Sequence, residues 1–349
     1  MALGCVTIVT IFIFCFMLHA SEAIIVGGNS LHVGFYDNTC PQVEKIVADV
    51  VDNAISEDRG LAAGLIRLFF HDCFVNGCDA SILLDSTPSD EPVEKESPAN
   101  GKTIRGLEII DEIKDQIEEQ CPATVSCADI LAFATRDAVV HSGLSNYPVP
   151  AGRRDGLSSR SADVLGNIFG PKSSVDEITE GFIRKGLTVE EMVVLTGAHS
   201  IGKSHCKFIT ERLYNHSSTN TKDPNLDDAH ANYLSRKCPA RGSLLAEFLG
   251  KIGLGGFFVD ELGNLVDLDQ VTPVILDNAF YINLLHRRSL LQSDQAMAFH
   301  PRTSEIVQRM AVDQREWSKK FTMAMNQLGR VDVLTGEQGE IRKNCRAVN

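Results

Sequence analysis

In the stretch 65–81, LIRLFFHDCFVNGCDAS, two basic side chains interrupt an almost wholly apolar run that covers 61–74. Arg67 and His71 are four residues apart and therefore share one face of a helix, with Phe70 beside them. Burying a guanidinium and an imidazole in an apolar helix is costly unless other groups pair with them. The structural alternative is a satisfied core histidine and an arginine that reaches a surface carboxylate. The residues that follow favour a reactive site.

Oxygen-bearing side chains follow this pair around a tight turn at Gly77. Carboxylates, hydroxyls and free carbonyls in a short loop suit Ca²⁺, although the spacing is not that of an EF-hand. Cys73 and Cys78 bracket the turn. We therefore predict a metal loop, held by its own disulfide, whose side-chain ligands are Asp72, Asp79 and Ser81.

A second histidine with oxygen-bearing neighbours occurs downstream. The segment LTGAHSIGKSHC places His199 near the start of a predicted helix, with Ser200 next to it. Asp294 is a candidate to accept the other ring N–H of a metal-ligating histidine. Further oxygen-bearing residues follow later in the chain, and the alternative to a metal site is that they are surface loop residues that bind nothing. The segment VDLDQVTPVILDN contains Asp269, Thr272 and Asp277, whose side-chain oxygens suit Ca²⁺.

The elements that must position these groups are mainly helices. Apolar residues recur at helical spacing, whereas strand signals are few and short. The sequence therefore predicts a mainly α fold, with a turn-rich stretch at 143–160. The predicted helices cover 40–58, 61–74, 104–119, 126–141, 175–184, 189–195, 276–286 and one run from 304 to 328.

The first twenty residues are apolar and end in small residues, which is typical of a signal peptide. The apolar part is long and lacks a basic start, so a membrane anchor is the alternative to cleavage after Ala23. No other stretch approaches the length of a membrane span. We predict a cleaved signal at 1–23 and a single secreted domain at 24–349.

Cysteine usage and charge agree with secretion. The predicted mature chain keeps eight of the ten cysteines, which indicates four disulfides without choosing their pairing. Zinc is disfavoured because no CxxC pair occurs. A formal net charge of −13 argues against a nucleic-acid partner. Asn215, in Asn-His-Ser, is a glycosylation acceptor.

Several of these segments occur together in one known family. In chain order, RLFFHDCFVNGCDASILL, VSCADILA, GRRD, LTGAHSIG and TPVILDN make the sequence resemble the class III plant haem peroxidases from about residue 31 to residue 349. The resemblance implies a mostly helical fold with one haem b between a distal and a proximal lobe. It also implies a monomeric enzyme of the apoplast or cell wall.

The resemblance assigns roles to the first group of residues. His71 matches the distal acid–base histidine, Arg67 the distal arginine and Phe70 the aromatic residue against the haem. Asn100 matches the asparagine that hydrogen-bonds the distal histidine. A distal calcium is implied at Asp72, Asp79, the Ser81 hydroxyl and the Val75 and Gly77 carbonyls, with Glu94 linked through water.

The second group matches the proximal side. His199 corresponds to the iron ligand and Asp294 to its carboxylate partner. A second calcium is implied at Ser200, Asp269, Thr272, Asp277 and the Ile275 carbonyl. The family's disulfide pairs are all present as Cys40–Cys121, Cys73–Cys78, Cys127–Cys345 and Cys206–Cys238.

The implied reaction reduces hydrogen peroxide and oxidises small phenolic donors in one-electron steps via a ferryl intermediate. His71 would act as general base and then acid, while Arg67 stabilises the charge that develops as the O–O bond breaks. Asp294 would give His199 partial imidazolate character. The expected partners are hydrogen peroxide and phenols, with no nucleic acid and no membrane after signal cleavage.

The sequence departs from the family pattern in two places. Phe169 replaces a substrate-contacting proline in NIFGP, so we expect a different entrance shape. The apolar, glycine-rich segment 243–259 is predicted to be an insertion beside the proximal calcium, with a gene-model artefact as the alternative. The other histidines show no partner pattern and are interpreted as surface or structural: His32, His141, His205, His216, His230, His286 and His300.

Two other functions stay open. A non-enzymatic relative could keep the disulfide and calcium frame as a binding or cell-wall protein. A calcium-dependent hydrolase would need a second catalytic carboxylate or a nucleophile near His71. The first alternative is opposed by the complete set of Arg67, His71, Asn100, His199 and Asp294.

Overall fold

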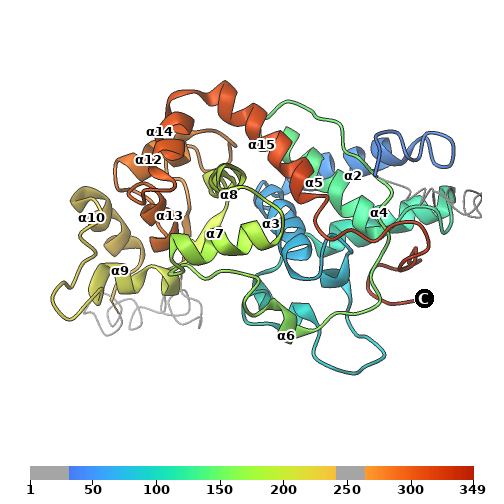
Figure 1. Cartoon of the computed structure of the whole chain (residues 1–349), viewed down its shortest axis with the longest axis horizontal. Helices are drawn as coiled ribbons and strands as arrows, with labels where there is room; N and C mark the ends of the chain where they lie inside the picture. The colour runs from blue at the N-terminus through green and yellow to red at the C-terminus, as the bar shows by residue number, and fades with distance from the viewer. Residues whose placement is uncertain (1–30, 241–263) are drawn as a thin grey trace, which may run out of the picture. The chain divides into compact units, whose positions relative to one another are not determined.

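The computed structural model describes residues 31–240 and 264–349 (Figure 1). The predicted signal peptide and the segment 243–259 lie outside these residues. Helices dominate, which confirms the mainly α prediction, and Leu31–Asn349 form one compact unit. The helices are α2 (Val43–Glu57), α3 (Gly60–Val75), α4 (Leu107–Gln120), α5 (Cys127–His141), α6 (Ser161–Val164), α7 (Val175–Arg184), α8 (Val189–Thr196), α9 (Thr210–Tyr214), α10 (Asp228–Lys237), α12 (Ala279–Leu285), α13 (Gln292–Met297), α14 (Ser304–Val312) and α15 (Gln314–Leu328).

Helix α3 is apolar on nearly all sides because it is buried in the core, where it packs against α5 (Figure 1). Thr135 of α5 donates a hydrogen bond to the Leu65 carbonyl of α3 at 3.3 Å. Ser126 caps the start of α5 by accepting from the Asp129 N–H at 3.1 Å. Asp155 accepts from the Cys127 and Ala128 N–H groups at 3.1 and 2.9 Å. Helix α3, which carries His71, therefore packs against a buried helix, α5, whose N-terminus is capped.

Two buried arginines tie distant segments to this core. Arg153 of the GRRD motif pairs with Asp129 at 2.7 Å and also donates to the Gly329 carbonyl at the end of α15. Arg342 donates to the carbonyls of Ala80 and Gly156 at 2.9 and 2.7 Å. Because a buried guanidinium must be hydrogen-bonded, these contacts fix the loop after α3 against the C-terminal segment.

The chain after α8 forms a 3₁₀ turn, Gly197–Ser200, and then strand β1 (Lys203–His205). β1 pairs in antiparallel register with β2 (Leu265–Asp267), Ser204 facing Val266. The prediction that His199 lies near the start of a helix is wrong, because it follows the end of α8. Only glycine fits at Gly197, where an added Cβ would lie 2.5 Å from the Tyr281 hydroxyl and 2.7 Å from Trp317 Nε1.

The single helix predicted at 304–328 is also wrong, because α14 and α15 are separate helices. Asp313 between them has extended backbone with φ −126° and ψ 101°, and its carboxylate accepts from the Arg315 and Glu316 N–H groups at 2.8 and 3.0 Å. An N-cap in mid-segment ends one helix and begins the next. Both helices bury apolar residues in the core, so the apolar periodicity continues across the break.

A smaller apolar cluster lies around α9, α10 and β2, and includes Leu213, Leu234 and Val266. The disulfide Cys206–Cys238 belongs to this cluster. In the described part of the chain, no helix is long and apolar enough to span a membrane. The other disulfides are Cys40–Cys121, Cys73–Cys78 and Cys127–Cys345, so all four pairs are those that the resemblance implies.

Candidate active site

His71 lies on α3, is only 6 % exposed, and has a defined partner. Its Nδ1 is 2.5 Å from Asn100 Oδ1, and Asn100 Nδ2 donates to the Glu94 carbonyl at 2.7 Å. Since the amide nitrogen is occupied in that way, Oδ1 faces the imidazole as an acceptor. His71 therefore carries its proton on Nδ1, and Nε2 is left as a free base.

The environment of His71 keeps the imidazole neutral. Burial and the charge of Arg67 lower its pKa to about 3, although the hydrogen bond to Asn100 acts in the opposite direction. At pH 7 the ring can therefore accept a proton at Nε2. An unprotonated base with a fixed tautomer is the state that proton abstraction requires.

Arg67 lies on α3 one helical turn before His71, and its side chain is held by hydrogen bonds. Its guanidinium donates to the Thr103 and Ala99 carbonyls at 2.8 and 2.9 Å and to the Thr103 hydroxyl at 3.1 Å. Burial lowers the pKa of Arg67 to about 10, so the side chain stays charged at pH 7. A guanidinium has five N–H donors, so some remain for a ligand after these three contacts.

His199 is positioned by a carboxylate on the opposite side of its ring. Its Nδ1 is 3.0 Å from Oδ2 of the buried Asp294, which lies on α13. Burial lowers the pKa of His199, but the charge of Asp294 and its hydrogen bond outweigh burial and raise the pKa above its ordinary value. The side chain is 39 % exposed, and no described residue hydrogen-bonds Nε2. The free nitrogen is therefore available to a ligand.

These groups fit a bound haem. The charge of Arg67 acts on both histidines, because it lowers the pKa of His71 and that of His199. One histidine presents a free Nε2 with a carboxylate behind it, as an iron ligand requires, and the other presents a free base. Phe70 packs against Phe74 and Phe182 with ring centroids 4.3 and 6.0 Å apart, which adds an aromatic wall.

The loop after α3 concentrates buried acids. Asp72, Asp79 and Glu94 are all buried, and Asp72 accepts from the Ala80 N–H at 3.0 Å. Burial raises the pKa of Asp72 well above its ordinary value, and the charges of Asp79 and Glu94 add to this effect. Burial also raises the pKa of Glu94 to about 8. Mutual repulsion of this kind is relieved by a bound cation.

Two buried oxygens of this loop, the Ser81 hydroxyl and Glu94 Oε2, make no hydrogen bond of good geometry to a described residue. The Ser81 hydroxyl nevertheless acts against the rise in the pKa values of Asp79 and Glu94. Glu94 Oε1 accepts from Asn76 Nδ2 at 2.8 Å. In the described residues, no three His, Cys, Asp or Glu side chains are arranged to hold a metal by themselves. A cation here would therefore need the hydroxyl and carbonyl oxygens as well, which is usual for Ca²⁺.

The second acidic loop brings its predicted residues together. The Ser200 hydroxyl donates to the Ile275 carbonyl at 2.8 Å and accepts from the Asp277 N–H at 3.1 Å. Asp269 is buried and lies 3.4 Å from the Thr272 hydroxyl. Burial and then the charge of Asp277 raise the pKa of Asp269. The hydrogen bonds form two sets, Ser200 with Ile275 and Asp277, and Asp269 with Thr272, and each set contains one carboxylate.

Phe169 packs its ring on Gly181 of α7, where an added Cβ would overlap the ring. The absence of a side chain at Gly181 thus leaves the space that the Phe169 ring occupies. Asn215 is exposed at the end of α9, where a glycan has access.

Other contacts at the site had no recognisable signal in the sequence. Lys185, at the end of α7, donates to the Val75 carbonyl at 3.1 Å and pairs with Asp332 at 3.0 Å. The Val75 carbonyl is one of the predicted calcium ligands. The supports of Arg67 at Ala99 and Thr103 were also missed, because backbone acceptors leave no trace in residue identity.

Comparisons with known proteins show the family to which the chain belongs. A family model described as "Peroxidase" matches residues 47–313. Peroxidase 5 of Vitis vinifera is 43 % identical over 319 residues, which cover 91 % of this chain and 92 % of that relative. Peroxidase C2 of Armoracia rusticana is 41 % identical over 323 residues, covering 91 % and 88 %, respectively. With identity of this level over nearly the whole length, the chain belongs to the class III plant haem peroxidases.

Proposed function

We propose that this haem peroxidase reduces hydrogen peroxide with His71 as the proton carrier and Arg67 as the charge-stabilising group. The main support is the geometry at His71, where Asn100 holds the Nδ1 proton and Nε2 is a free, neutral base. Nε2 takes the proton from one peroxide oxygen and returns it to the departing oxygen, which leaves as water. The remaining N–H donors of Arg67 stabilise negative charge as the O–O bond breaks.

His199 is proposed as the residue that would hold the haem iron, through its free Nε2. Asp294 accepts the Nδ1 proton, fixes the ring orientation and increases electron donation from the ring. A bound haem supplies the redox chemistry, which is the reduction of the peroxide bond and the one-electron oxidation of donors. Asn100 and Asp294 thus make the two imidazoles different, because an amide leaves one neutral and a carboxylate gives the other partial negative character.

We propose two structural calcium ions. The distal ion would bind Asp72, Asp79, the Ser81 hydroxyl and the Val75 and Gly77 carbonyls, with Glu94 linked through water. Support comes from the unpartnered Ser81 hydroxyl and from the raised pKa values of the buried acids. The proximal ion would bind Ser200, Asp269, Thr272, Asp277 and the Ile275 carbonyl.

Removal of calcium by prolonged chelation is expected to lower both the melting temperature and the activity, because a ligand that binds only the folded state stabilises it. Ser81→Ala is expected to weaken calcium retention. Ser97→Ala is a matched control, because the Ser97 hydroxyl is also buried without a hydrogen-bond partner among the described residues but is not a proposed ligand. Metal analysis and calorimetry measure both effects. Unchanged stability after verified metal removal would rule out the structural role.

The remaining proposals concern the setting of the reaction. The reductants are small phenols that reach the haem edge past Phe169, whose backbone carbonyl would replace the contact that a proline usually makes. The protein is proposed to lose residues 1–23, to be secreted to the apoplast or cell wall as a monomer of residues 24–349, and to carry a glycan at Asn215.

An absorption spectrum of the haem-loaded protein tests the proposed function. The Soret band is expected to fall after one equivalent of hydrogen peroxide and to recover when a phenol is added. A stable Soret band without a response to peroxide would contradict the distal roles of His71 and Arg67. Failure to bind haem at all would favour a non-enzymatic binding or cell-wall protein.

A further inference from the structure

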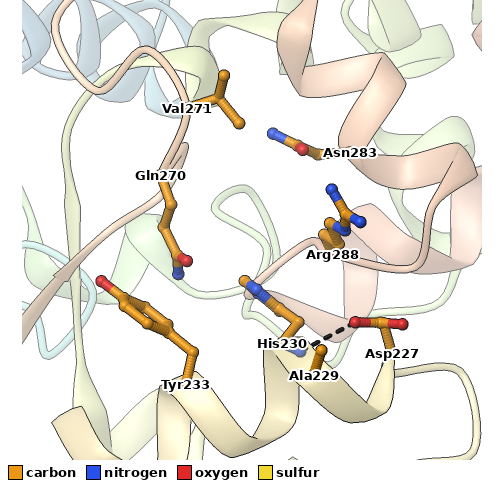
Figure 2. Close-up of a pocket in the computed structure, with 8 residues that line it drawn as sticks. All are labelled: Asp227, Ala229, His230, Tyr233, Gln270, Val271, Asn283 and Arg288. Carbon is orange, nitrogen blue, oxygen red and sulfur yellow. Dashed lines mark hydrogen bonds between the residues drawn. The ribbon is translucent and has the colours of Figure 1, made fainter.

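One pocket of the structure is lined by residues to which no role is assigned above (Figure 2). It lies at the start of α10 and includes side chains that follow β2 and α12. Its volume is about 280 Å³, just below the range of about 300–1,000 Å³ that is usual for small-molecule sites. The polar side chains of the lining are Asp227, His230, Tyr233, Gln270, Asn283 and Arg288.

His230 is the central polar group of this pocket. The side chain is only 9 % exposed, and its Nε2 is buried without a hydrogen-bond partner among the described residues. Its backbone N–H donates to Asp227 at 2.9 Å, and its ring stacks on Tyr233 at a centroid distance of 6.3 Å and an interplanar angle of 15°. The imidazole is therefore buried beside Tyr233 while its Nε2 is unsatisfied, which is costly in a folded protein.

Gln270 repeats this feature on a different segment. Its Nε2 is also buried and makes no hydrogen bond within the described part of the chain. Figure 2 shows Gln270, Asn283, Arg288 and His230 around one common space. The amide of Asn283 is already engaged, because its Nδ2 donates to Asp269 at 3.1 Å. Two nitrogens of the lining, Gln270 Nε2 and His230 Nε2, thus have no hydrogen-bond partner among the described residues.

The lining carries one carboxylate, Asp227, and one guanidinium, Arg288, and the two differ in whether a neighbour already hydrogen-bonds them. Arg288 is exposed, and no hydrogen bond or ion pair of its guanidinium occurs among the described residues. The only carboxylate of the lining, Asp227, is turned to the N-terminus of α10, where it accepts from the His230 N–H. The dipole of this ten-residue helix favours negative charge at the same end. The Arg288 guanidinium and Gln270 Nε2 are therefore unused donors, and His230 Nε2 is a third in the tautomer that carries its proton there.

We propose that this pocket binds a small monocarboxylate with a flat apolar body, for which benzoate is the simplest probe. Arg288 and the Gln270 amide donate to the carboxylate, and His230 donates from Nε2. Tyr233 and Val271 supply the apolar part of the lining. Burial lowers the pKa of His230 to about 4, so the imidazole is neutral near pH 7 and the positive charge comes from Arg288.

The test is a titration of the calcium-saturated, haem-loaded protein with benzoate, followed by ligand-observed NMR. We expect saturable binding, and weaker binding of benzamide, the neutral analogue. Arg288→Gln, Gln270→Leu and His230→Phe should each weaken benzoate binding by about tenfold, as expected for the loss of a hydrogen bond to a charged group. His230→Phe keeps an aromatic ring on Tyr233. Arg236→Gln, an equal charge change on α10 outside the pocket, should leave affinity unchanged.

Three outcomes would overturn the proposal. The first is no saturable benzoate binding, and the second is equal affinity for benzoate and benzamide. The third is binding that shifts the Soret band and is unaffected by the three pocket variants, because the benzoate would then occupy the haem cleft. Thermal unfolding of each variant shows whether the protein is folded, so a loss of affinity is interpreted only for folded variants.

Discussion

His71→Ala is expected to slow peroxide reduction by roughly 10²- to 10⁴-fold, the usual contribution of a positioned acid–base group. The reason is that His71 Nε2 is the free, neutral base described above, with its tautomer fixed by Asn100. Haem binding should persist, since the proposed iron ligand, His199, is untouched. Stopped-flow absorbance at the Soret band gives the rate, and the haem-to-protein ratio gives retention.

The pH dependence of the unmodified protein supports or contradicts the same assignment. Because the pKa of His71 is lowered to about 3, the base is unprotonated at higher pH, and the rate should fall only as the pH drops through that value. A fall centred near pH 6.5, the ordinary histidine pKa, would argue against this environment. His286→Ala, in an exposed histidine, is the control and should leave the rate unchanged.

His199→Ala is expected to have the second large effect, which is loss of haem rather than loss of a proton carrier. The free Nε2 of His199 is the proposed iron ligand, and Asp294 holds the ring from behind at 3.0 Å. Gel filtration should separate haem from the variant protein under conditions in which the unmodified protein retains it. The apoprotein should still fold around its apolar core.

The two histidine variants serve as controls for each other. His71→Ala should retain haem and react slowly, whereas His199→Ala should release haem. Asp294→Asn tests the partner separately, because it keeps the ring contact but removes the charge. It should retain haem and shift the iron reduction potential upward, as less electron density reaches the metal. Firm haem binding by His199→Ala would refute the ligand assignment.

The spacing of apolar residues along the sequence was sufficient to predict much of this fold. Helix α7 begins and ends where its apolar spacing predicts, at Val175 and Arg184. The two histidines were identified by their neighbours in sequence, because an imidazole next to a carboxylate or hydroxyl is unusual in an apolar segment. The structure places Asn100 beside His71 and Asp294 beside His199.

The errors have a common physical origin in contacts between distant segments. His199 was placed near a helix start, but α8 ends before it in a turn that packs against Tyr281 and Trp317. The contact of Lys185 with the Val75 carbonyl spans 110 residues and leaves no local pattern. For His230, which the sequence leaves as surface or structural, the structure adds that it is buried and lines a pocket with Gln270 and Arg288 from later segments.

The contacts of Arg342 have a consequence for the order in which the protein is made. The carbonyl of Ala80, in the proposed distal calcium loop, is 262 residues from the arginine that binds it. During synthesis the N-terminal helices emerge first, and this loop has to wait for its buried guanidinium. The distal half of the active site is therefore completed late in translation, when α3 and α5 have long been available to pack. Premature haem capture by a nascent chain is disfavoured, because the loop beside His71 is not yet held in place.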